Sequence, residues 1–201
     1  MLRKLASLVY AIRPAQAYKV GIVWLPALFH GHGSLRDQAG VLALASLAWL
    51  LGSGVVYLLN DLKDASSDRQ RSDRVHRPIA QGIIKPWEAL VFAVSLLVAL
   101  SGLLCVLPGR ISILLALYAI LNIIYTYGLK ESLGLRQAII ALGFWFRLQS
   151  GAEPVTTIPL TPWASLFTLG LAYQLNCLKG IASFDQDHHR GYRFAMGMGA
   201  G

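Results

Sequence analysis

Six apolar stretches restrict what this sequence can fold into, at about residues 17–33, 39–59, 87–107, 110–127, 134–152 and 160–181. Each is near the roughly 20 residues that a helix needs to cross a bilayer, although Pro26 shortens the first. Helices are expected because the stretches lack the two-residue alternation of barrel strands, and hydrocarbon offers no water to satisfy backbone groups. The sequence therefore predicts an all-α fold, a polytopic transmembrane helical bundle of about six spans, in one membrane-embedded domain over residues 1–201.

The charged residues support a membrane protein and indicate how the chain is oriented in the membrane. Charged residues make up only 14% of the chain and the mean hydropathy is +0.53, whereas soluble domains are about one quarter charged. The net charge of +8 would suit nucleic acid, but the positive residues lie between apolar stretches, so we expect no nucleic-acid partner. With a cytoplasmic N-terminus, only Arg36 and Arg110 fall in outer connections, as the positive-inside rule requires. We expect a bacterial-type inner or plasma membrane, with the N-terminus and the active site in the cytoplasm.

An acidic motif, Asn60-Asp61-Leu62-Lys63-Asp64-Ala65-Ser66-Ser67-Asp68, follows the second stretch. Read as a helix end, its aspartates lie at i, i+3 and i+7 and share one face. Crowded carboxylates repel one another, and at a helix C-terminus they also oppose the helix dipole. A bound Mg²⁺ would reverse that penalty, with Asn60 as a neutral ligand or an orienting group. We therefore predict Asp61, Asp64 and Asp68 as metal ligands and catalytic residues; solvated charges at a helix end are the alternative.

Arginines follow in what we expect to be a long inner loop, residues 60–86. Arg69, Arg74 and Arg77 are predicted to bind a phosphate group, because guanidinium groups pair well with phosphate oxygens. The Arg77-Pro78 pair and Gly82 indicate a loop of defined shape. The alternative is that these residues only supply the positive charge usual for inner loops.

A second inner loop, residues 128–136, is expected after the fourth stretch. Tyr125, Tyr127 and Lys130 lie at this boundary. Hydroxyl and ammonium groups there could reach the same phosphate, and we assign Lys130 a catalytic role. The alternative is a belt of interfacial tyrosines with a lysine extended toward water.

Two further candidates lie later in the chain. Arg147 is within the fifth stretch near its outer end, so it either faces a polar cavity or extends toward the interface. The segment after the sixth stretch contains Lys179, Asp185 and Asp187, which could form a second metal site or a polar tail. The adjacent His188 and His189 invite a zinc site, but carboxylates beside arginines suit Mg²⁺ with phosphate better.

These residues resemble the UbiA superfamily of integral membrane prenyltransferases. The family signature Asn-Asp-x-x-Asp-x-x-x-Asp is matched from Asn60 to Asp68, and the resemblance covers about residues 10–190. It implies a nine-helix fold open to lipid, in which this motif binds Mg²⁺ and the phosphate of a polyprenyl donor. Because six spans are predicted here, we expect the chain to resemble part of that fold and to be incomplete at its C-terminus.

Finer spacing resembles the branch that makes decaprenylphosphoryl-5-phosphoribose. There an arginine follows the last aspartate by nine residues, as Arg77 follows Asp68, and Gly143-Phe-Trp-Phe-Arg147 is similar to a second motif. This resemblance implies phosphoribosyl diphosphate and polyprenyl phosphate as substrates. The sequence departs from the branch after the acidic motif, and Ser183 replaces the first aspartate of the superfamily's second motif.

The sequence thus predicts an Mg²⁺-dependent membrane transferase of the prenyltransferase type, leaning to phosphoribosyl transfer onto polyprenyl phosphate. One alternative is prenylation of an aromatic or other small acceptor from polyprenyl diphosphate. From another class, the chain could be a non-catalytic lipid-phosphate-binding protein or an inactive fragment. An ion transporter is disfavoured, because no predicted span has a central acid. The predicted substrate-binding residues are Asn60, Arg69, Arg74, Arg77, Tyr125, Tyr127, Arg147, Lys179 and Asp187.

Overall fold

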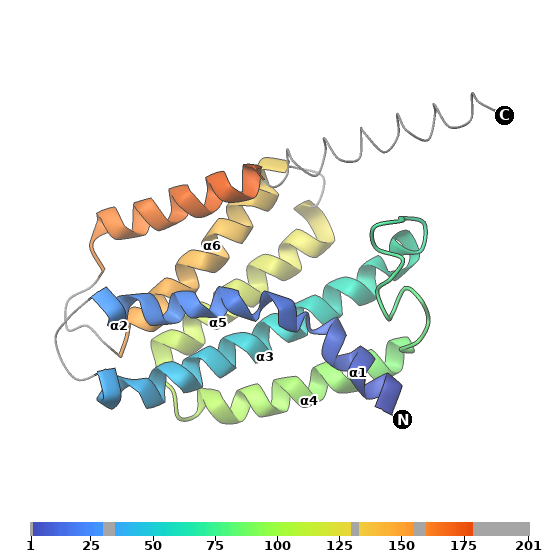
Figure 1. Cartoon of the computed structure of the whole chain (residues 1–201), viewed down its shortest axis with the longest axis horizontal. Helices are drawn as coiled ribbons and strands as arrows, with labels where there is room; N and C mark the ends of the chain where they lie inside the picture. Colours follow the sequence, from blue (N-terminus) through green and yellow to red (C-terminus); the bar gives the residue numbers. More distant parts are fainter. Residues whose placement is uncertain (1, 30–34, 130–132, 155–159, 179–201) are drawn as a thin grey trace.

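The computed structural model describes residues 2–29, 35–129, 133–154 and 160–178, in which every regular element is helical (Figure 1). The all-α prediction is therefore confirmed. The elements are α1 (Leu2–Ala11), the 3₁₀-helix η1 (Pro14–Trp24), α2 (Leu25–Phe29), α3 (Leu35–Asp68), α4 (Pro86–Leu104), α5 (Gly109–Ile124), the π-helix η2 (Tyr125–Leu129) and α6 (Leu133–Ala152). Residues 162–178 form one more helix.

Three of the described helices are long and apolar enough to cross a membrane: Arg36–Asp68, Pro86–Leu104 and Gly109–Gly128. They correspond to the second, third and fourth predicted spans. The fifth and sixth predicted spans coincide with α6 and with the helix of residues 162–178. Together these segments indicate an integral membrane protein. Figure 1 shows that the C-terminal ends of α3 and α5 and the first turns of α4 and α6 lie at the same end of the bundle.

The first predicted span, residues 17–33, is wrong as a single α-helix in its described part. The chain follows a 3₁₀-helix to Trp24, and only then does the short α2 begin. Pro26 explains the break, because it has no N–H to donate to the carbonyl of Ile22. The N–H of Leu25 bonds to that carbonyl instead.

The two inner loops are shorter than predicted. Helix α3 continues through Asp68, so the acidic motif is helical and the loop contains only residues 69–85. Helix α6 already begins at Leu133, so Arg136 is on a helix and not in a loop. For α3 the physical reason is that Asp61 and Asp68 find cationic partners, which offsets the unfavourable position of acids at a helix C-terminus.

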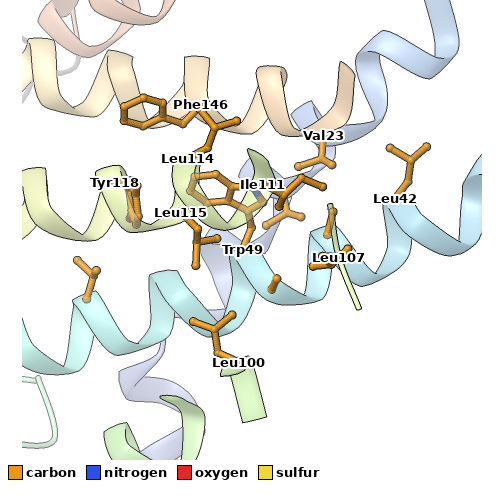
Figure 2. Close-up of a cluster of buried hydrophobic side chains, with 14 residues drawn as sticks. Val23, Leu42, Trp49, Leu100, Leu107, Ile111, Leu114, Leu115, Tyr118 and Phe146 are labelled. Carbon is orange, nitrogen blue, oxygen red and sulfur yellow. The ribbon is translucent and has the colours of Figure 1, made fainter. Parts of the chain in front are cut away.

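The main core joins α3, α5, α6 and η1 around Trp49. Figure 2 shows this side chain between α3 and α5, with Ile111, Leu114 and Phe146 beside it. The ring of Trp49 meets that of Tyr118 edge to face at 5.2 Å between centroids, a favourable geometry for aromatic pairs. This core fixes α5 and α6 against the long helix α3.

A second apolar cluster holds the loop after α3 in place. Ile79 and Ile84 from the loop are buried against Leu58 of α3 and against Ala89 and Ala93 of α4. Burial of this kind, at about 25 cal/mol per Å² of apolar surface, gives the loop a defined conformation. The shaped loop inferred from Arg77-Pro78 and Gly82 is confirmed, and Gly82 adopts a left-handed φ of 74°.

Candidate active site

Two aspartates at the end of α3 are joined by one arginine. Asp61 and Asp68 lie two helical turns apart and are 3% and 0% exposed. Arg77 Nη1 donates to Asp61 Oδ1 at 3.0 Å and to Asp68 Oδ2 at 2.7 Å. Buried carboxylates are strongly disfavoured unless they are paired. Arg77, which the sequence predicts as a phosphate-binding residue, is thus engaged in direct ion pairs with the acidic motif.

Arg13 also belongs to this cluster, although it was not among the predicted site residues. Its Nη2 donates to Asp61 Oδ1 at 2.6 Å, and its guanidinium lies 4.8 Å from the centre of the Tyr57 ring. Arg13 has a φ of 56°, an uncommon value for a residue with a Cβ. The available signal was the Arg13-Pro14 pair, since Arg77-Pro78 has the same form. We call Arg13, Asp61, Asp68, Arg74 and Arg77 the carboxylate cluster.

The second oxygen of Asp68 is the best ligand position for a metal in this cluster. Among the described residues, Asp68 Oδ1 is buried without a hydrogen-bond partner, and Arg74 Nη1 lies 3.6 Å from it. An anionic oxygen of this kind suits Mg²⁺, which prefers carboxylate ligands. Within the described parts of the chain, however, no three His, Cys, Asp or Glu side chains form a metal-binding group. The residues fit a cation held partly by other oxygens, such as phosphate.

Asp64 faces a separate cavity, of about 250 Å³. We call it the arginine cavity; its lining comes from α3, the following loop, η2 and α6, namely Asp64, Ser67, Arg71, Arg74, Tyr125 and Arg136. Arg136 was not among the predicted site residues, because only packing brings the first turns of α6 to α3. Three guanidinium groups and two hydroxyls make this a space suited to phosphate oxygens.

Two arginines of the arginine cavity, Arg71 and Arg74, pair with one more carboxylate, Asp73. Arg71 Nε donates to Asp73 Oδ1 at 3.1 Å, and Arg74 Nε lies 3.4 Å from Asp73 Oδ2. The hydrogen bond from Arg71 lowers the pKa of Asp73, so this carboxylate is charged at neutral pH. It offsets part of the positive charge of the loop arginines.

An apolar groove lies beside these polar sites. It has a volume of about 190 Å³, and its lining is almost entirely apolar. It lies between α3, α4 and α5 and is lined by Gly52, Val55, Val56, Leu59, Asn60, Leu97, Leu100, Leu115, Tyr118, Ala119, Asn122, Ile123, Thr126 and Tyr127. At its polar end, Thr126 Oγ1 donates to Asn60 Oδ1. Thr126 lines the groove and its neighbour Tyr125 lines the arginine cavity, so both spaces border the π-helix.

Several other predicted residues have observed positions. Arg69 Nε donates to the Ala80 carbonyl at 3.0 Å and braces the loop. Tyr127 is exposed at the edge of the groove, with Lys63 Nζ 5.1 Å from its ring centre. A role in substrate binding stays a prediction for Arg69 and Tyr127. The predicted residues Lys130, Lys179 and Asp187 lie outside the described part of the chain.

Arg147 is buried in the core and does not extend to the interface. It is 5% exposed, and it donates to Ser53 Oγ and to the Gly143 carbonyl, each at 2.7 Å. Its guanidinium also lies 4.7 Å and 5.0 Å from the ring centres of Trp49 and Tyr118. Of the two alternatives that the sequence left open, the structure therefore favours a buried polar environment.

Comparison with known proteins identifies a protein family that this chain matches. A family model described as the UbiA prenyltransferase family matches residues 20–195. Decaprenyl-phosphate phosphoribosyltransferase of Mycolicibacterium smegmatis is 32% identical over 172 residues, which cover 84% of this chain and 53% of that protein. Protoheme IX farnesyltransferase of Stenotrophomonas maltophilia is 34% identical over 132 residues, which cover 64% of this chain and 40% of that protein. The chain thus spans about half the length of the curated relatives it matches.

A solved structure with a similar fold is a UbiA homolog from Archaeoglobus fulgidus bound to GPP and Mg²⁺. It has a TM-score of 0.65 and 16% sequence identity, and the match covers 95% of this chain and 65% of that one. At this level of identity the likeness concerns the fold alone, and it agrees with the helical bundle described above.

Proposed function

Because the chain belongs to the UbiA prenyltransferase family, we propose that it is an Mg²⁺-dependent membrane transferase acting on a polyprenyl phosphate. More specifically, it transfers a phosphoribosyl group from phosphoribosyl diphosphate to the lipid phosphate. The named phosphoribosyltransferase relative supports this choice of substrates. The observation that carries the proposal is that an apolar groove and an arginine-lined cavity both border the π-helix, the groove at Thr126 and the cavity at Tyr125.

This geometry suits a lipid and a water-soluble substrate that react with each other. An isoprenoid chain gains free energy by burying apolar surface in the groove, at about 25 cal/mol per Å². Its phosphate would then lie near Asn60, at the polar end of the groove. The arginine cavity opens on the other side of the π-helix, beside Asp64, and suits a phosphorylated sugar. Neither space alone would accommodate both substrates.

The chemistry needs charge stabilisation more than a protein nucleophile. The bond between the ribose carbon and the diphosphate breaks, the diphosphate leaves with the electron pair, and an oxygen of the lipid phosphate bonds to that carbon. Arg74 and Arg77, which pair with Asp68 and Asp61, are proposed to stabilise phosphate oxygens, and Lys130 is proposed to assist them. Asp61, Asp64 and Asp68 would hold Mg²⁺, which when bound neutralises charge on the leaving diphosphate.

The active site is proposed to face the cytoplasm. The supporting observation is that the end of the bundle with α1 and the loop after α3 carries most of the basic residues, whereas Arg36 and Arg110 lie near the opposite ends of α3 and α5. A water-soluble phosphorylated sugar would then enter from the cytoplasmic side.

A second function is prenyl transfer from polyprenyl diphosphate to an aromatic or other small acceptor. The similarity to the protoheme farnesyltransferase favours it. A chain that only binds lipid phosphate remains the alternative outside enzymes, since the carboxylate cluster and the groove would also suit that role.

One assay distinguishes these functions. Membranes containing the chain are supplied with Mg²⁺, polyprenyl phosphate and labelled phosphoribosyl diphosphate, or with Mg²⁺, polyprenyl diphosphate and an aromatic acid or haem. Labelled lipid in the first mixture alone is expected. Product in the second mixture alone would replace phosphoribosyl transfer by prenyl transfer. Failure in both mixtures would favour the binding protein.

A further inference from the structure

Arg136 is the arginine of the arginine cavity that neither the acidic motif nor the following loop supplies. It lies in the first turns of α6, and packing of α6 against α5 and η2 brings it to the cavity. The Tyr125 hydroxyl, on η2, interacts with its side chain. Arg136 therefore interacts with a residue of a π-helix, an element that recurs at functional sites.

The arginines of the cavity differ in how their charge is balanced. Arg71 and Arg74 both pair with Asp73, and Arg74 also lies 3.6 Å from Asp68. No ion pair joins Arg136 to a carboxylate anywhere in the described residues. A half-buried guanidinium without a carboxylate partner is favourable where an anion binds beside it.

The volume and the hydroxyls of the cavity indicate which anion fits. About 250 Å³ far exceeds the roughly 10–15 Å³ that one water needs. Ser67 and Tyr125 add hydroxyl groups that can donate to oxygen. Several donors around one space match the many acceptor oxygens of a phosphate or diphosphate group better than a single carboxylate.

The position of the cavity separates two sources of phosphate. The lipid phosphate is expected at Asn60, where the apolar groove ends, whereas the arginine cavity is lined by charged and hydroxyl-bearing residues and lies beside the loop of residues 69–85. We propose that the arginine cavity binds a phosphate or diphosphate group of the water-soluble co-substrate, and that Arg136 is the residue that selects a phosphorylated co-substrate over an uncharged one. This inference rests on the proposed function.

Binding of inorganic pyrophosphate tests the cavity without requiring turnover. The purified 201-residue chain in detergent is titrated with pyrophosphate, followed by calorimetry. Arg136→Gln is expected to weaken binding by about tenfold or more, because a charge-assisted hydrogen bond is lost, and Arg136→Lys should restore part of the affinity. The matched control is Arg110→Gln, which removes an exposed arginine on α5 that pairs with Glu153 at the other end of the bundle. Equal affinity of Arg136→Gln and Arg110→Gln would overturn the proposal.

Steady-state kinetics then distinguish the source of the phosphate. Arg136→Gln should raise KM for phosphoribosyl diphosphate about tenfold and leave KM for polyprenyl phosphate nearly unchanged. A higher KM for the lipid alone would overturn the assignment to the soluble co-substrate. If the wild-type chain binds pyrophosphate through Arg136 but transfers no phosphoribosyl group, the binding site stands and the proposed function fails. If transfer occurs and Arg136→Gln leaves both KM values unchanged, the proposed function stands and the role assigned to Arg136 fails.

Discussion

Replacing Arg77 by methionine tests whether the carboxylate cluster stabilises the fold. The substitution removes the cation between Asp61 and Asp68, which are at most 3% exposed and cannot easily regain hydration. Asp61 keeps Arg13 at 2.6 Å, whereas Asp68 keeps only Arg74, at 3.6 Å, among the residues that the structure describes. Breaking a buried ion pair typically costs about 3–5 kcal/mol. Since Arg77 is itself 22% exposed and two arginines remain, we expect about 3 kcal/mol.

The measurement is thermal unfolding in detergent, followed by tryptophan fluorescence or circular dichroism. For a chain of this size, about 3 kcal/mol corresponds to a fall in Tm of about 6–12 °C. Arg110→Met is the control, because it breaks an exposed pair with Glu153 that contributes about 0–1 kcal/mol. Adding Asp68→Asn to Arg77→Met should recover part of the loss. If Arg77→Met lowers Tm no more than Arg110→Met, the account of the cluster is refuted.

Two further substitutions test the packing around the site. A Cβ at Gly151 of α6 would lie 1.8 Å from the Val23 carbonyl oxygen, so Gly151→Ala should destabilise the chain by about 1–3 kcal/mol. Gly102→Ala faces open space and should be neutral or slightly stabilising in the same unfolding assay; equal Tm values for the two variants would contradict this packing. Ser53→Ala removes the hydroxyl that Arg147 Nη2 contacts at 2.7 Å. It should cost about 1–3 kcal/mol in denaturant unfolding, and an unchanged midpoint would show that Arg147 does not depend on this hydroxyl.

Hydropathy predicts much of this fold because crossing a bilayer demands long apolar helices. The stretches at residues 39–59, 87–107 and 110–127 became helices that meet this demand. The residues at which the helices begin and end were harder to predict. The end of α3 is polar, and its helical continuation to Asp68 depends on arginines that are supplied by distant parts of the chain. The interruption near Pro26 is local, and the proline indicated it.

The candidate site was predictable where its residues are adjacent in sequence. Asp61, Asp68 and Arg77 come from one helix and the loop that follows it. Arg13 and Arg136 could not be placed, because they reach the site only through the packing of η1 and α6. The sequence also did not predict that the three aspartates of the acidic motif have different surroundings. Their i, i+3, i+7 spacing predicts one shared face. In the structure, Asp64 lines the arginine cavity, whereas Asp61 and Asp68 pair with Arg77.

The most direct test of the proposed function is the transfer of label from phosphoribosyl diphosphate to polyprenyl phosphate by membranes containing the chain. The wild-type chain is assayed with Mg²⁺ and with excess chelator, beside Asp64→Ala and the control Arg110→Gln. We predict labelled lipid for the wild type and the control in Mg²⁺, and a loss of at least about 100-fold on chelation or in Asp64→Ala, equivalent to about 2.7 kcal/mol. Transfer by Asp64→Ala at the wild-type rate, or no transfer by the wild type, would contradict the account.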